Sequence, residues 1–154
     1  MIERYTNPEM GNIWSDQAKY QTWLDVEIAA CEANCKLGKI PQSAMETIRT
    51  KARFKPERIL EIEEEVRHDV IAFLTNVNEY VGDAGRYIHV GMTSSDVLDT
   101  GLALQLKSSV KLLRKELLLL EEAIRDLASQ HKKTVMIGRS HAIHGEPITF
   151  GFKL

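Results

Sequence analysis

The chain has 154 residues and a formal net charge of −2, from 20 basic and 22 acidic side chains. This length is enough for one domain, or for one domain and part of another. The basic residues are scattered, which excludes a general nucleic-acid surface, and every apolar run is too short to span a membrane. The first ten residues, MIERYTNPEM, lack the apolar segment of a secretory signal, so we expect a cytoplasmic protein.

The first long helix is predicted between residues 15 and 37. Pro8 and Gly11 break the polar stretch 1–14, which we therefore expect to be extended. Ser15 is a suitable N-cap residue, and Gly38 suits the position just after the helix. Apolar side chains then recur along one helical face, at Tyr20, Leu24, Ile28, Cys31 and Cys35.

Two shorter helices and a third, apolar one are expected next. The second helix covers about 42–52, and Pro56 begins an acidic helix, ILEIEEEV, whose acidic face we expect to be solvated. The segment 67–81, RHDVIAFLTNVNEYV, has the apolar spacing of a buried helix, and its polar residues stand at its start. Gly82 and Gly85 then break the chain.

The longest predicted element runs from Asp96 to about His131. Its apolar residues alternate steps of four and three, a heptad pattern, at Leu106, Val110, Leu113, Leu117, Leu120, Ile124 and Leu127. Further leucines widen this stripe, which favours a multi-helix bundle over a two-stranded coiled coil. The predicted fold is therefore all-α: a small helical domain over 1–93, then the first long helix of an incomplete bundle domain over 94–154.

The last segment differs in character from the helices. TVMIG is short and β-prone, GRSHAIHGE is predicted as a polar loop, and Pro147 is expected to open another helix at its first position. The chain then stops in an apolar, uncapped FGFKL. From this ending we expect the front portion of a larger protein.

Cys31 and Cys35 lie one helical turn apart on a predicted apolar face. Such a pair is typical of a helical protein core, and a metal site would need further ligands at suitable spacings. We therefore expect no disulfide and no metal ion.

Three polar clusters hold four of the five histidines. They are Arg67-His68-Asp69, the run from His89 through Thr93 and Ser94 to Ser95, and Gly138-Arg139-Ser140-His141 with His144. Unpaired N–H groups at a helix start bind anions, and histidine transfers protons near neutral pH. Taken singly, each histidine could be a hydrogen-bonded structural residue, and a serine or Asp96 could simply cap the long helix. Together the clusters predict acid–base chemistry on an anionic small molecule, whereas His131, at a helix end, is expected to be structural.

Four motifs carry a family resemblance over the whole chain. RYTNPEM (4–10), RHDVIAF (67–73), HVGMTSSDVLDT (89–100) and GRSHAIHGEPITFG (138–151) resemble the N-terminal portion of the adenylosuccinate lyase family, in the fumarase/aspartase superfamily. The resemblance implies that the full-length protein splits adenylosuccinate into AMP and fumarate by β-elimination, and acts likewise on the succinylated carboxamide ribotide of purine biosynthesis. It implies no cofactor and a homotetramer, consistent with the long apolar stripe.

The resemblance also implies a role for individual residues. His141 matches the general acid, and His68 the histidine that assists it. Arg4 and Tyr5 match contacts on the phosphate side of the substrate. The remaining substrate-binding positions are Arg67, His68, Asp69, His89, Thr93 and Ser94, of which Thr93 and Ser94 lie on the carboxylate side.

The chain departs from the family pattern in two ways that bear on its expected activity. The loop GRSHAIHGEP stands where the family has GRTHGIHAEP, with Ser140 keeping the hydroxyl. The family's serine base lies far downstream, beyond this chain, so we expect the chain alone to be inactive. The alternatives are another fumarate-releasing lyase of the superfamily and a non-catalytic helical assembly module; a scaffold, however, would not need clustered loop histidines.

Overall fold

The computed structural model describes residues 2–154 and divides the chain into two compact units, Met1–Ser109 and Val110–Leu154. The division falls inside the long helix α6 (Ser94–Gln130), which contributes to both units. The domain boundary expected between residues 93 and 94 stays a prediction. The all-α class is confirmed: apart from one short hairpin, the described elements are helices.

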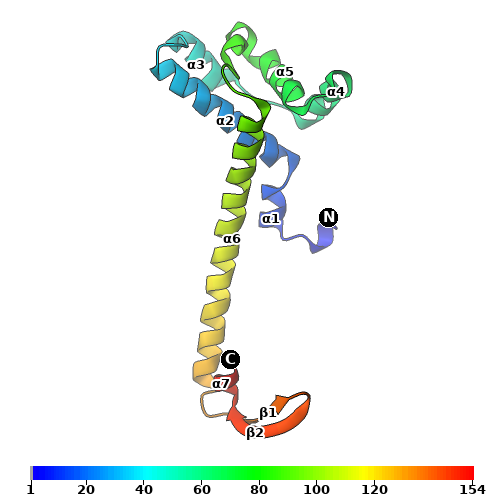
Figure 1. Ribbon diagram of the computed structural model, residues 1–154, viewed down its shortest axis with the longest axis vertical. Coiled ribbons are helices and arrows are strands. Elements are labelled where there is room, and N and C mark those ends of the chain that lie inside the picture. The colour runs from blue at the N-terminus through cyan, green and yellow to red at the C-terminus, as the bar shows by residue number, and fades with distance from the viewer. Residues whose placement is uncertain (1) are drawn as a thin grey trace. The chain divides into compact units, whose positions relative to one another are not determined.

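In the first unit α4 lies beside α5 (Figure 1). In chain order its elements are η1 (Glu3–Tyr5), α1 (Pro8–Ile13), α2 (Asp16–Lys36), α3 (Gln42–Lys51), α4 (Pro56–Val66), α5 (Asp69–Val81), η2 (Gly82–Tyr87) and the beginning of α6. The helices expected over 15–37, 42–52, from Pro56 and over 67–81 are all confirmed.

The prediction that residues 1–14 are extended is wrong, because they contain η1 and α1. The Asn7 side chain accepts a hydrogen bond from the Met10 N–H at 3.1 Å and caps α1. Pro8 occupies the first turn, where its missing N–H removes no helical hydrogen bond. The proline therefore begins a helix instead of breaking one.

Local caps fix both ends of α2. The Ser15 hydroxyl accepts a hydrogen bond from the Ala18 N–H at 3.2 Å. Gly38 follows the helix with φ = +73°, a left-handed conformation that glycine adopts without strain. These are the two residues expected from the sequence to bound the helix.

The core of the first unit joins α2 to α5 through aromatic rings. Tyr20 stacks on Phe73 with ring centroids 6.0 Å apart, and Trp23 meets Phe73 edge-on at 5.6 Å. Phe54, in the segment between α3 and α4, packs against both Tyr20 and Phe73. Such rings contribute large buried areas and favour these offset and edge-on geometries.

Helix α6 meets α2 at Gly101 and then carries the leucine stripe. A Cβ added at Gly101 would lie 2.8 Å from Trp23 Cδ1, so only glycine permits this close approach. The stripe is largely exposed in the chain: Leu106 48%, Val110 61%, Leu113 54%, Leu117 64%, Leu120 55% and Leu127 41%. None of the helices in the described part of the chain combines the length and apolar content needed to cross a lipid bilayer.

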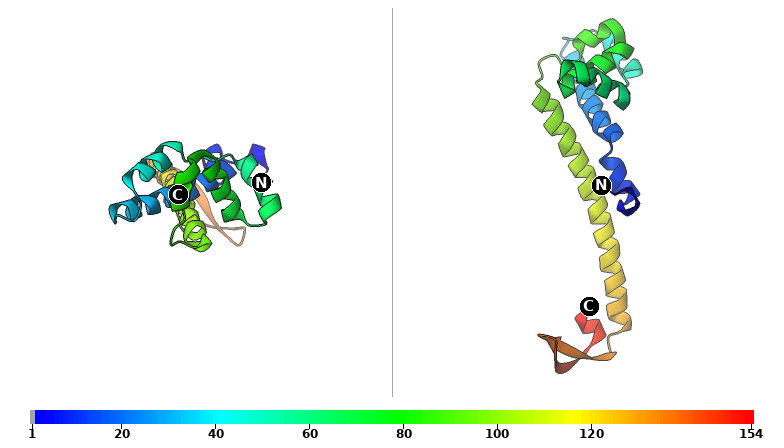
Figure 2. Two further views of the ribbon diagram at one scale, coloured as in Figure 1. Left: turned by 90° about the horizontal axis from the view of Figure 1, so that it is seen from above. Right: turned by 90° about the vertical axis from the view of Figure 1, so that its right-hand side faces the viewer.

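The second unit ends in a hairpin and a short helix (Figure 2). Strands β1 (Val135–Ser140) and β2 (Ile143–Thr149) pair antiparallel, and α7 (Phe150–Lys153) follows with Thr149 as its N-cap. The predicted polar loop and the helix opening at Pro147 are therefore wrong. Pro147 pairs with Ile137 in a two-stranded sheet, where each strand has a free edge that tolerates a missing N–H.

Candidate active site

The Arg67-His68-Asp69 cluster joins α4 to α5. Arg67 has left-handed backbone angles (φ = +54°) and ends α4, which turns the chain sharply. His68 caps α5: its Nδ1 accepts a hydrogen bond from the Ile71 N–H at 3.4 Å. In the neutral ring this assignment leaves the proton on Nε2, and the His68 side chain is 46% exposed. His68 can thus cap its helix and still present an N–H donor.

Carboxylates surround this cluster. Asp69 Oδ1 lies 3.4 Å from His68 Nδ1 and accepts the Val70 N–H at 2.7 Å. Arg67 lines an open cavity of about 520 Å³ together with Leu60, Glu63 and Glu64. Two glutamates line this cavity beside a single arginine, so the cavity alone does not favour an anion.

The His89 loop is anchored to α2 by a buried acid. Glu27 is only 1% exposed, and its two oxygens contact His89: Oε2 accepts the backbone N–H at 3.0 Å, and Oε1 lies 2.5 Å from Nδ1. The His89 backbone is left-handed, with φ = +66°. The side chain of His89 remains 19% exposed.

The hydroxyl run, Thr93, Ser94 and Ser95, lies at the start of α6. This helix begins at Ser94, earlier than the predicted Asp96. Asp96 Oδ2 accepts the Thr93 N–H at 2.8 Å, and the Asp96 N–H donates back to the Thr93 carbonyl at 3.0 Å. Asp96 therefore caps the start of α6, which is the structural role that the sequence allowed for it. The Thr93 N–H is occupied, whereas the hydroxyls of Thr93 and Ser94 have no hydrogen-bond partner within residues 2–154.

His141 lies at the tip of the β1–β2 hairpin in the second unit. His141 and Ala142 form a two-residue turn with φ values of +49° and +63°, between the paired residues Ser140 and Ile143. Positive φ at both central positions defines a type I′ turn, which usually contains Asn or Gly. The His141 side chain is exposed, and the neighbouring His144 Nε2 lies 3.5 Å from an Arg139 Nη2.

His131 has structural contacts in the turn after α6. Its Nδ1 lies 3.1 Å from the Thr134 hydroxyl, and its ring packs 5.0 Å from that of Phe150 in α7. Its carbonyl accepts the Gly151 N–H at 3.0 Å. These contacts hold the end of the second unit together and support the structural role expected for His131.

The remaining predicted residues, Arg4 and Tyr5, lie in η1 near the chain start. The Arg4 guanidinium stacks 4.8 Å from the centroid of the Tyr5 ring, and Tyr5 is 74% exposed. Among the described residues, no hydrogen bond or ion pair joins this pair, the 67–69 cluster and the 89–94 loop to one another. His141 belongs to the other unit.

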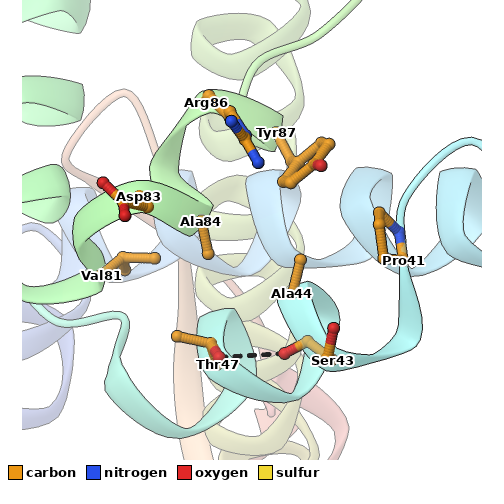
Figure 3. Close-up of a pocket in the computed structure, with 9 residues that line it drawn as sticks. All are labelled: Pro41, Ser43, Ala44, Thr47, Val81, Asp83, Ala84, Arg86 and Tyr87. Atoms are coloured by element: carbon orange, nitrogen blue, oxygen red, sulfur yellow. Dashed lines mark hydrogen bonds between the residues drawn. The ribbon is translucent and has the colours of Figure 1, made fainter.

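A separate cavity of about 360 Å³ opens between α3 and η2 (Figure 3). Its lining includes Ser43, Thr47, Asp83, Arg86 and Tyr87, and none of the predicted site residues. Across residues 2–154, no three His, Cys, Asp or Glu side chains group so as to hold a metal ion. Cys31 and Cys35 are free thiols.

Sequence reasoning missed Glu27, the buried acid beneath His89. Its signal is an acidic residue on an otherwise buried helical face, between Trp23 and Cys31 at four-residue spacing. Glutamate is seldom fully buried unless it is paired, so an acid at such a position indicates a specific partner.

Comparison with known proteins assigns the chain to a family. The sequence profile of a family described as lyase matches residues 3–154. This chain belongs to that lyase family. The match covers all three histidine-containing clusters, the long helix and the hairpin.

The lyase relatives include adenylosuccinate lyases, which confirms the resemblance found in the motifs. The chain is 71% identical to the adenylosuccinate lyase of Synechocystis and 49% identical to that of Aquifex aeolicus. Both matches cover 100% of this chain and 36% of the relative. The chain thus spans about a third of the length of the curated relatives it matches.

Solved structures of other proteins share the fold at lower identity. A fumarate lyase from Mesorhizobium sp. BNC1 superposes with a TM-score of 0.87 at 30% identity, covering 96% of this chain and 36% of that one. A 3-carboxy-cis,cis-muconate lactonizing enzyme from Pseudomonas putida superposes with a TM-score of 0.88 at 31% sequence identity. This match covers 97% of this chain and 36% of that one. One fold therefore carries proteins named for different reactions, and the site residues must decide between them.

Proposed function

We propose that this chain forms part of a C–N lyase that cleaves adenylosuccinate to AMP and fumarate, and the succinylated carboxamide ribotide to its carboxamide and fumarate. The 71% identity to an adenylosuccinate lyase over the whole chain carries the proposal. The three polar clusters support it, because a succinylated nucleotide offers phosphate and carboxylate groups that cations and hydroxyls can bind.

The proposed reaction is a β-elimination with balanced proton transfers. A base removes a proton from the carbon next to a carboxylate. The electron pair left behind forms the fumarate double bond as the C–N bond breaks, and an acid protonates the leaving nitrogen. His141 is the proposed acid, and His68 assists it. An exposed imidazole on a sharply turned hairpin is suited to that role, because histidine side chains in general serve as proton donors and acceptors in enzymes.

The binding roles are assigned to the other predicted residues. Arg4 and Tyr5 contact the substrate phosphate, whereas Arg67, Asp69 and His89 bind other parts of the substrate. Thr93 and Ser94 bind a carboxylate. Because the Asp96 carboxylate occupies the Thr93 N–H, the two hydroxyls, rather than the Thr93 amide, are the proposed donors.

The whole enzyme is proposed to be a cytoplasmic homotetramer that needs no metal or cofactor. The catalytic base is assigned to the part of the relatives that this chain does not span, about two-thirds of their length. The chain alone is then inactive, because it lacks the base and because its leucine stripe is exposed.

A chimera tests this function. The chain replaces the matching segment of the Synechocystis relative, and fumarate release is followed by absorbance with adenylosuccinate or argininosuccinate as substrate. The proposal predicts turnover of adenylosuccinate at about 1 per second or faster, and none of argininosuccinate. Comparable turnover of argininosuccinate would favour the alternative of another fumarate-releasing lyase, and no turnover of either would contradict both.

The chain without its remainder provides the second arm of the test. Purified alone, it should release no fumarate from adenylosuccinate. Turnover of about 1 per second by the chain alone would contradict its assignment as an incomplete part.

A further inference from the structure

We propose that Glu27 is a positioning residue for His89: it holds a proton on Nδ1 and leaves Nε2 as the nitrogen that contacts the substrate. The identity of that substrate rests on the proposed function, but the contact itself does not. Glu27 lies on α2, far from His89 in sequence, and both of its oxygens contact this one residue.

The chemistry of the contact assigns the protons. The His89 backbone N–H can only donate, so Glu27 Oε2 must accept at 3.0 Å. A buried carboxylate is costly unless it is fully hydrogen-bonded. Glu27 is 1% exposed, and the 2.5 Å contact between Oε1 and His89 Nδ1 supplies its second hydrogen bond. A carboxylate that accepts both N–H groups satisfies the pair, with Nδ1 as the protonated nitrogen.

A second contact one turn further along α2 holds the same segment. The Cys31 thiol donates to the Tyr87 carbonyl at 3.6 Å. Burial, and after it the negative charge of Glu27, raises the pKa of Cys31 to about 11, so the thiol stays protonated and able to donate. Two successive turns of α2 thereby fix residues 87–89.

This anchoring explains the backbone of His89. A left-handed conformation (φ = +66°) is unfavourable for a histidine and persists only where surrounding contacts impose it. Glu27 supplies such a contact at the His89 N–H, and the His89 carbonyl accepts the Met92 N–H at 3.3 Å. The ring is thus held just before the hydroxyl run of Thr93 and Ser94.

Nε2 is the nitrogen left for a ligand. It has no hydrogen-bond partner among the described residues, and the His89 side chain is 19% exposed. With one proton fixed on Nδ1, Nε2 accepts a hydrogen bond when the ring is neutral and donates one when the ring is protonated. The carboxylate beneath orients the ring, as carboxylates behind metal-binding histidines do.

Nitrogen-15 NMR of the histidine-labelled chain tests the proton position without any substrate. The His89 signals are assigned by their loss in H89Q, and the wild-type chain should show a protonated Nδ1. In E27Q the amide offers one acceptor and one donor, so the neutral ring should move its proton to Nε2. E32Q, on the same helix, is the matched control: Glu32 pairs with Arg49 and not with His89, so the exchange should leave the His89 tautomer unchanged. An unprotonated Nδ1 in the wild-type chain would overturn the proposal, whether or not the E27Q variant folds.

Kinetics of the chimera test the positioning role. E27Q should raise KM for adenylosuccinate about 10- to 100-fold, the size expected for a hydrogen bond to a charged group, and change kcat much less. E27D keeps both acceptor oxygens and should recover part of this loss. Because Glu27 acts through His89, the E27Q/H89Q double variant should be no worse than H89Q alone.

The two arms separate failure of this proposal from failure of the proposed function. An inactive wild-type chimera would contradict the function, while the NMR result would still decide how Glu27 holds His89. An active chimera whose KM is unchanged by E27Q, or in which the effects of E27Q and H89Q multiply, would overturn the positioning role and leave the function standing.

Discussion

Replacing Gly101 by alanine should destabilise the first unit, although alanine is the better helix former. A Cβ at this position would lie 2.8 Å from Trp23 Cδ1 and 2.9 Å from Thr22 Oγ1. Optimal carbon contacts are about 3.5–4.0 Å, so one of these groups must move. Trp23 is only 4% exposed and packs edge-on against Phe73, which leaves its ring little room.

The expected magnitude is a difference of two opposing effects. Overpacking in a core typically costs about 1–3 kcal/mol, and the rigid ring places Gly101→Ala in the upper half of that range. The higher helix propensity of alanine, relative to glycine, stabilises the folded state by about 1 kcal/mol. The net prediction is a loss of about 1–2 kcal/mol in the free energy of unfolding.

Urea unfolding measures this loss, followed by the fluorescence of Trp23 in a Trp14→Phe background. Ala103→Gly, on an exposed position of the same helix, is the matched control: it should lose about 1 kcal/mol through propensity alone. A Gly101→Ala chain as stable as the wild type, or more stable, would refute the reasoning that glycine is required for the approach of α6 to α2.

Three further changes test other parts of the account. Leu113→Asp with Leu120→Asp should abolish association of the chain or leave it aggregated, and light scattering that shows the wild type to be a folded monomer would contradict this. Ala142→Gly should stabilise the hairpin by about 1 kcal/mol, because φ = +63° strains alanine by more than the entropy that glycine adds; a lower melting temperature would disprove it. Hydrogen bonds, chiefly from Arg58 and to a lesser extent from Asn76, lower the pKa of Glu79. The ionised Glu79 therefore stabilises the folded chain at neutral pH, and this stabilisation is lost as the pH falls through the folded-state pKa. The stability gap between wild type and Glu79→Gln should therefore narrow in acid, and a gap independent of pH would exclude this ionisation as its source.

The helices of the first unit were predictable because local signals bound them. Ser15 and Gly38 cap α2 with side-chain and backbone contacts that depend only on neighbouring residues. Pro8 gave a wrong prediction, because a proline breaks a helix when it lies in the interior but is favoured in the first turn. Asn7 caps α1 and places Pro8 in that first turn.

The hairpin was not predictable from local pattern. β1 has a β-prone sequence, but β2 is polar and exposed over most of its length, so it lacks the alternation that marks a half-buried strand. Its turn also uses His141 and Ala142 where a type I′ turn usually has Asn or Gly. The two strands become recognisable only through their pairing.

The candidate site was predictable as residue clusters but not as contacts. His68, His89 and His141 stand out because imidazoles gather with glycines and hydroxyls in short segments. Glu27 is distant from His89 in sequence, and only the packing of α2 against the following loop brings its carboxylate to the ring. Capping by Asp96 likewise required the position at which α6 begins.

The proposed acid role of His141 is the central claim, and one comparison tests it most directly: kcat and substrate affinity of the chimera carrying His141→Gln, with His131→Gln as control. The account predicts a loss of kcat of about 100- to 10,000-fold with adenylosuccinate still bound, because other groups hold its anionic parts. The contacts of His131 are with Thr134, Phe150 and the Gly151 N–H, and none is with a proposed site residue, so its variant should turn over at close to the wild-type rate. A His141 variant that keeps more than about half of the wild-type kcat, where loss of a positioned acid should cost at least 100-fold, would contradict the account and leave His141 a structural residue of the hairpin turn.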